Sequence, residues 1–140
     1  NNVKTVFEKI LKKLPESPPY FPKEGEYLTD KPEKFFVSEI IREKILMNYY
    51  KEIPYSCEVM VESFKEEETI IKISTEIMVE RDSQKGIIIG HKGEKLKTVG
   101  TQARHDIEKF LGKKVFLKIF VKVDKDWRMN EQKLRKYGYL

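Results

Sequence analysis

The chain has 140 residues, of which 39% are hydrophobic and 36% are charged, which suits one domain, or a small domain with a piece of another, and excludes a large multi-domain enzyme or a disordered chain. The net charge is only +5, but residues 85–140 hold 15 basic and 6 acidic side chains, whereas residues 1–84 hold 13 and 17. This concentration of positive charge favours a local binding site for a polyanion.

The N-terminal part predicts a short helix followed by a linker. Apolar side chains recur at intervals of three and four over residues 3–14, the spacing of one helical face. Residues 14–22 then hold four prolines, which lack amide N–H groups and have a fixed φ, so the helix cannot continue. We expect residues 1–14 to be the last helix of a preceding domain, residues 15–29 to be a Pro-rich linker, and the folded unit to begin near Asp30.

The next segments predict one helix and two strands. Asp30, with Glu33 three residues later, can cap a helix whose apolar stripe continues over residues 31–50. Residues 56–64 and 69–81 alternate apolar and polar side chains, which is typical of strands with one solvated face. A charged turn between these two segments predicts that the strands are joined directly.

The remaining segments predict two helices, a third strand and a tail. Residues 83–89 are long enough for two helical turns, and residues 94–111 have one apolar helical face followed by Gly112 at the C′ position. Residues 115–123 alternate an aliphatic face with a face of phenylalanines and lysines. Residues 127–140 are basic and suit a short helix. This order of elements predicts an α+β fold in which helices cover one face of the sheet.

Patterns typical of catalysis or metal binding are not found in the sequence. Cys57 is the single cysteine, which excludes an intramolecular disulfide and a multi-cysteine zinc site and fits a reducing, cytoplasmic setting. Residues 86–92 are one residue short of a phosphate-binding P-loop, with His91 where its lysine would stand. Neither His91 nor His105 suggests a catalytic pair. We therefore expect no enzymatic activity, cofactor or metal in this chain.

The loop formed by Gly90, His91, Lys92 and Gly93 is a candidate phosphate-binding site. Glycines let a sugar-phosphate backbone approach closely, and the first N–H groups of the helix from Glu94, together with Lys92, attract an anion. A glycine-containing turn between two helices is also a common structural element, so the loop alone is weak evidence. Its position between a short apolar helix and a long amphipathic helix, with strands on either side, favours a binding function.

These segments resemble the carboxy-terminal KH domain of the Era GTPase family. The resemblance covers nearly the whole chain, including the linker that joins the GTPase domain to the KH domain in that family. It rests on residues 14–22, 36–44, 52–56, 79–93, 100–104, 110–115 and 125–128.

The resemblance implies a type II KH domain over residues 30–125. This fold has a three-stranded mixed sheet with helices on one face, and here it would be preceded by the short helix and the Pro-rich linker and followed by a basic tail at residues 126–140. The strands on either side of the helix pair would be parallel. GTP hydrolysis, with its GTP and Mg²⁺, would belong to a GTPase domain outside this chain.

The resemblance also implies the site residues. Gly90, His91, Lys92 and Gly93 would clamp an RNA backbone, with Lys92 as the surer phosphate contact. Era proteins usually place a basic or small residue where this chain has His91. The base-holding groove and its basic surroundings would add Ile77, Val79, Lys85, Ile88, Ile89, Lys95 and Lys97, although the aliphatic residues also suit a core and the lysines a solvated face.

The function implied is the binding of single-stranded RNA, without DNA binding. The implied partner is the 3′ end of small-subunit ribosomal RNA, during assembly of the small ribosomal subunit in the cytoplasm. Two alternatives are a protein-interaction module and a peripheral contact with the inner face of the cell membrane. Phe116 and Phe120 could stack on bases, although packing against the first helix or a neighbouring domain suits them better.

Overall fold

The computed structural model describes residues 2–18 and 31–139 and divides the chain into two units, residues 1–30 and 31–140. In the first unit, helix α1 (Val3–Leu11) ends three residues before the predicted boundary, and its apolar side chains are exposed within the unit. The capping role predicted for Asp30 and most of the predicted linker lie outside the described residues.

The second unit begins with helix α2 (Glu33–Asn48), which is shorter at both ends than predicted. Pro32, at the N-cap, has an extended backbone that sets the start of the helix. Val37, Ile41 and Ile45 lie on one face and are fully buried. Their spacing of four residues is the reason that α2 can cover the sheet with a single apolar face.

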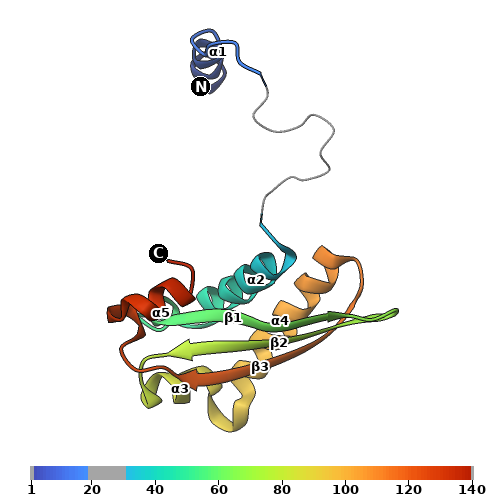
Figure 1. The fold of residues 1–140 in the computed structure, drawn as a ribbon, viewed down its shortest axis with the longest axis vertical. Coiled ribbons are helices and arrows are strands. Elements are labelled where there is room, and N and C mark those ends of the chain that lie inside the picture. The colour runs from blue at the N-terminus through green and yellow to red at the C-terminus, as the bar shows by residue number, and fades with distance from the viewer. Residues whose placement is uncertain (1, 19–30, 140) are drawn as a thin grey trace. The chain divides into compact units, whose positions relative to one another are not determined.

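The sheet has the order β1-β2-β3, with β2 at its centre. Strands β1 (Cys57–Glu66) and β2 (Ile70–Val79) are antiparallel, with a bulge between Val61 and Ser63, whereas β2 and β3 (Lys114–Val123) are parallel. The parallel pair is connected by helices α3 (Asp82–Ile89) and α4 (Glu94–Leu111). Figure 1 shows the three strands lying in front of α4. The predicted mixed sheet with helices on one face is confirmed.

The C-terminal segment packs as part of the second unit. A 3₁₀ turn (Trp127–Met129) leads into helix α5 (Glu131–Lys136). Trp127 is 3% exposed, and its ring lies 5.4 Å from that of Tyr137 and 5.9 Å from that of Tyr139. Lys133 and Tyr137 both donate hydrogen bonds to Asp124 just after β3. The residues predicted as a basic tail therefore include an aromatic cluster with a buried centre.

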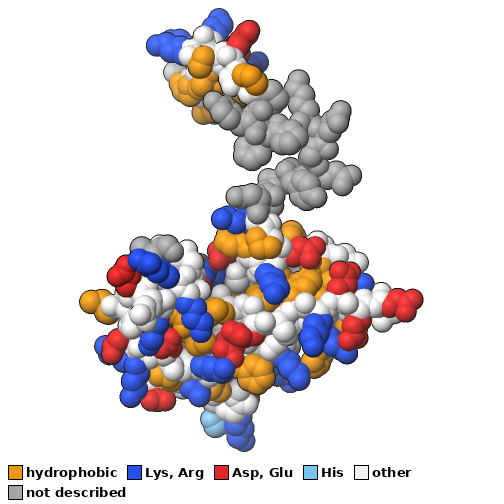
Figure 2. All heavy atoms as spheres, in the orientation of Figure 1, with side chains coloured by type: hydrophobic (Ala, Val, Ile, Leu, Met, Phe, Trp, Pro, Cys, Tyr) orange, Lys and Arg blue, Asp and Glu red, His pale blue; other side chains and the backbone are white. Residues whose placement is uncertain are grey.

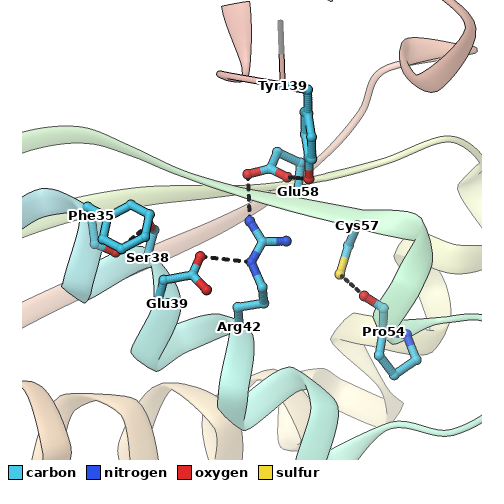
Figure 3. Close-up of polar contacts among 8 residues, drawn as sticks. All are labelled: Phe35, Ser38, Glu39, Arg42, Pro54, Cys57, Glu58 and Tyr139. Carbon is cyan, nitrogen blue, oxygen red and sulfur yellow. Dashed lines mark hydrogen bonds and ion pairs between the residues drawn. The ribbon is translucent and has the colours of Figure 1, made fainter. Parts of the chain in front are cut away.

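Arg42 joins three segments at the edge of the sheet (Figure 3). Its Nη2 donates to Glu58 Oε1 of β1 at 2.7 Å, and its Nε donates to Glu39 Oε1 at 3.0 Å. Tyr139 also donates its hydroxyl hydrogen bond to Glu58. Burial disfavours the charge of Arg42, but the hydrogen bond and Coulomb attraction of Glu58 outweigh it and raise the pKa of the guanidinium. This network holds α2 and the C-terminal segment to the edge strand β1.

Replacement of Arg42 by Ala should lower the free energy of unfolding by about 2 kcal/mol, because the Glu58 carboxylate, 6% exposed, would lose its charged partner. The matched control is Arg135→Ala, because Arg135 pairs with Glu131 where both side chains are about 70% exposed and such pairs contribute under about 0.5 kcal/mol. Urea unfolding of the two variants measures the difference. Equal losses of unfolding free energy in the two variants would show that the hydrogen bond from Tyr139 is enough to stabilise the buried Glu58 carboxylate.

Candidate functional site

The loop between α3 and α4 has an unusual backbone. Gly90 has φ +73° and ψ −179°, a region that is essentially restricted to glycine. Lys92 and Gly93 follow with φ of +49° and +81°, both left-handed. The residues His91–Gly93 form a single 3₁₀ turn, which the Gly93 N–H closes by donating to the Gly90 carbonyl at 3.3 Å. The loop is thus a tight, defined turn rather than an open connection.

Lys95 packs directly beneath this turn. A Cβ atom on Gly90 would lie 2.8 Å from Cβ and Cγ of Lys95, closer than real Cβ contacts occur. The Lys95 ammonium lies 5.9 Å from the ring centre of Tyr49, whose hydroxyl donates to the Ile88 carbonyl at 2.6 Å. Burial raises the pKa of this tyrosine to about 12. Lys95 and Tyr49 therefore fix the position of the loop against α2 and α3.

The amino end of α4 opens onto the same loop. Its N-cap residue is Gly93, which has no side chain to accept hydrogen bonds from the first turn. The positive end of this 18-residue helix therefore lies beside the exposed side chains of His91 and Lys92. The loop forms the lower tip of the unit in Figure 1, and in Figure 2 a histidine and a basic side chain project there. These features suit a phosphate group.

A groove of about 400 Å³ leads from the loop between α4 and β3. It begins at Gly93 and follows one side of α4 as far as Arg104. Its floor is apolar and its rim carries polar and basic groups. The lining residues are Gly93, Leu96, Lys97, Gly100, Thr101, Arg104, Leu117 and Ile119.

The groove exists because the helices leave the middle of β3 partly uncovered. Val115 and Val121, toward the two ends of the strand, are buried, whereas Leu117 and Ile119 between them are only half-buried. Gly100 lies opposite this gap, and a Cβ atom there would already be 3.5 Å from the Ile119 side chain. A larger residue at this position of α4 would fill the groove.

The charge of the groove suits a polyanion. Among the described residues that line it, Lys97 and Arg104 are basic and none is acidic. Other hollows of the described structure contain carboxylates, such as Glu58 beside the C-terminal segment and Asp106 between α2 and α4. A chain of phosphates would therefore meet basic side chains and no described carboxylate along this groove, whereas the other hollows mix both signs of charge.

Three of the predicted base contacts need correction. Ile77, Val79 and Ile88 have 0% exposure and belong to the hydrophobic core. Ile77 and Val79 are buried because β2 is the central strand and the helices cover its inner face, and Ile88 is buried in the same core from α3. The strand that borders the groove is the edge strand β3. These three side chains support the groove from within and have no surface to offer a ligand.

The other predicted residues divide into two groups. Gly93 and Lys97 line the groove, and His91 and Lys92 are exposed at its mouth. Lys85 and the half-buried Ile89 are on α3, and Lys95 packs toward Tyr49, so none of these three lines the groove. Direct RNA contact by any of these residues stays a prediction.

Sequence reasoning missed most of the groove. Leu96, Leu117 and Ile119 belong to the apolar faces predicted for residues 94–111 and 115–123, and no role is predicted for Gly100, Thr101 and Arg104. One signal was available: glycine within a helix costs about 1 kcal/mol relative to alanine, so Gly100 marks a close approach or an open space. Its spacing of four residues from Leu96 and from Arg104 places all three on one side of α4.

The family model described as "KH domain" matches residues 52–128, more than half of the chain. The chain belongs to the KH domain family. The matched region includes the whole sheet, both crossover helices and the loop between them.

Curated relatives are Era proteins. The chain is 55% identical over 127 residues to GTPase Era of Geotalea daltonii, covering 90% of this chain and 42% of that protein. It is 50% identical over 140 residues to the chloroplastic GTPase ERA-like protein of Arabidopsis thaliana, and the match covers 99% of this chain and 32% of that protein. The chain thus spans less than half the length of these relatives. It matches their KH portion and not their GTPase domain.

Solved structures agree with this match. A crystal structure of Era with MgGDPNP and nucleotides 1506–1542 of 16S ribosomal RNA superimposes with a TM-score of 0.90 at 39% identity, covering 99% of this chain and 46% of that one. A crystal structure of an Aquifex aeolicus Era variant bound to GDP·AlF4⁻ superimposes with a TM-score of 0.89, also at 39% identity.

Among residues 2–18 and 31–139, no three His, Cys, Asp or Glu side chains gather in a way that could hold a metal ion. Within the same part of the chain, no helix has the length and apolar character needed to cross a bilayer.

Replacement of Gly90 by Ala should destabilise the KH unit by about 2 kcal/mol, because the φ of +73° is strained for alanine and its Cβ would clash with Lys95. Gly86→Ala is the matched control: Gly86 lies within α3 with open space around it, so alanine there should stabilise by up to about 1 kcal/mol. Thermal unfolding compares the two. Similar melting temperatures would contradict the strain assigned to Gly90.

Proposed function

We propose that this chain binds single-stranded RNA through the loop at residues 90–93 and the groove between α4 and β3. The observation that carries the proposal is the continuity of the two: the loop opens onto a groove with an apolar floor, basic side chains and, among its described lining residues, no carboxylate. In the KH family a GxxG loop clamps the backbone of about four nucleotides. The geometry of this chain supports a loop that holds the RNA backbone and a groove that holds the bases.

The loop and the groove would act on different parts of the strand. The uncapped N–H groups at the start of α4, with Lys92, attract a phosphate group. Leu96, Leu117 and Ile119 provide an apolar floor for base faces. A duplex keeps its bases stacked and paired inside, so only unpaired nucleotides could enter the groove.

The partner we propose is the 3′ end of small-subunit ribosomal RNA, during assembly of the small ribosomal subunit in the cytoplasm. Two findings support it: the identity of 49–55% to Era proteins over most of this chain, and the Era complex with nucleotides 1506–1542 of 16S ribosomal RNA. GTP hydrolysis would belong to the GTPase domain that those relatives carry in addition to the KH portion.

The double variant His91→Asp, Lys92→Asp should abolish RNA binding and leave the fold intact. Both side chains are exposed, so the effect on stability should stay within about 0.5 kcal/mol, whereas two carboxylates would repel the phosphates. The milder Lys92→Ala should weaken binding and reduce the slope of log affinity against log salt by about 0.7, the value of one contact to a single strand. Fluorescence anisotropy at several salt concentrations, with single-stranded and duplex forms of the 16S fragment, measures both effects.

The same titrations separate the alternatives. If the double variant stays folded and binds the single strand with unchanged affinity and salt slope, the loop is not the RNA site and a protein-interaction module becomes the better proposal. Equal affinity of the wild type for single strand and duplex would also count against the groove. Co-sedimentation with anionic vesicles in the absence of RNA tests the membrane-contact alternative.

Replacement of Gly100 by Ala should change stability and binding in opposite directions. The added methyl group meets Ile119 at an ordinary contact distance of 3.5 Å, and alanine is favoured in a helix by about 1 kcal/mol, so the melting temperature should rise or stay unchanged. The methyl group also narrows the groove, so RNA affinity should fall severalfold. Unchanged affinity in the more stable variant would show that bases do not reach this part of the groove.

A further inference from the structure

The outer face of β3 carries a second surface that the groove does not include. Successive side chains of a strand point to opposite faces of the sheet. Leu117 and Ile119 therefore point into the groove, and Phe116, Lys118 and Phe120 point to the face that the helices leave open. Phe116 is 48% exposed and Phe120 50% exposed. Because β3 is an edge strand, the two surfaces are separated only by the width of this strand.

The open face beside these rings is polar and basic. The β2 neighbours of Phe116, Lys118 and Phe120 are Lys72, Ser74 and Glu76. The two charged neighbours are compensated, because Lys72 pairs with Glu67 and Glu76 pairs with Lys122. In Figure 2, basic and hydrophobic side chains lie interspersed with acidic ones over the face toward the viewer.

Two lysines on β3 are available to bind an anion. Lys114 and Lys118 are exposed and form no ion pair with any residue that the structure describes. The Lys118 ammonium lies 5.6 Å from the centre of the Phe116 ring. Lys118 is thus held near an aromatic face, and its ammonium donates no hydrogen bond to any residue that the structure describes.

We infer that Phe116, Lys118 and Phe120, with Lys114 at the start of the strand, bind the continuation of the RNA strand after it leaves the groove across the edge of β3. We call these four residues the β3 platform. Phe116 and Phe120 are four residues apart, which separates their Cα atoms by about 13 Å along the strand, so each ring would stack on a different base. Lys114 and Lys118 would contact the phosphates beside those bases. This inference rests on the proposed function of the groove.

Two features favour RNA over a protein partner for this surface. Lysine is depleted in the cores of protein interfaces, yet Lys114 and Lys118, which form no ion pair with a described residue, interleave with the rings here. The platform is also continuous with the groove through the same strand, so a ligand already bound in the groove would reach it without a second independent encounter.

The test compares two RNAs derived from nucleotides 1506–1542 of 16S ribosomal RNA on the complete 140-residue chain. One is a single strand of about four nucleotides, the length that the loop clamps, and the other has about twelve nucleotides and can extend over β3. Phe116→Ala, Phe120→Ala should bind the short RNA as the wild type does and lose roughly a hundredfold in affinity for the long one, about tenfold for each ring. Phe116→Trp, Phe120→Trp should restore long-RNA binding, because tryptophan also stacks.

Two control variants keep this test decisive. Phe35→Ala removes a ring that is 41% exposed on α2, near the opposite edge strand, and should affect neither RNA. Lys118→Glu keeps both rings, and it should weaken long-RNA binding even if the double alanine variant fails to fold. Circular dichroism and thermal unfolding establish which variants are folded.

The outcomes separate the inference from the proposed function. If the loop variant His91→Asp, Lys92→Asp loses both RNAs and the folded platform variants bind the long RNA as the wild type does, the groove stands and the β3 platform is overturned. The same result would favour a protein partner for the outer face of β3. If the wild type binds neither RNA, or the folded loop variant binds both normally, the proposed function itself fails.

Discussion

The parallel pairing of β2 and β3 is the constraint on which the site depends. A parallel partner cannot be reached by a tight turn, so the chain must cross over one face of the sheet. Here residues 80–113 make the crossover with two helices, and the sharp turn between them is the loop at residues 90–93. The same crossover leaves β3 at the edge of the sheet, with α4 beside it. Loop and groove are thus consequences of one topological requirement.

The charged side chains at the two edges of the sheet differ. On the far side of the sheet from β3, at the edge strand β1, carboxylates such as Glu58 are neutralised by Arg42 and hydrogen-bonded by Tyr139. Near the groove, Lys97 and Arg104 have no carboxylate among the described lining residues. The excess of basic residues after position 84 therefore does not become a uniform positive surface. Six of these basic residues form ion pairs, whereas Lys92 in the loop and Lys97 and Arg104 in the groove form none with any residue that the structure describes.

Sequence periodicity predicted the fold well because each strand and helix buries one regular face. The alternation in β3 could not reveal that Val115 and Val121 are buried while Leu117 and Ile119 border a groove, because that difference depends on how closely α4 approaches. The assignment of Ile77 to the groove failed for the same reason: a buried strand residue and a groove residue look alike until the strand order is known. The aromatic packing of Trp127 likewise depends on contacts with residues more than nine positions away.

Several features that weaken stability lie at the loop, in the groove and on the outer face of β3. Gly90 and Lys92 have backbone conformations that cost energy, Gly100 lowers the helix propensity of α4, and the half-exposed rings of Phe116 and Phe120 each forgo roughly 1 kcal/mol of burial. A sequence selected for stability alone would remove such costs. The proposed RNA strand, which would follow the loop, the groove and the outer face of β3, would explain why these costs are kept at those places.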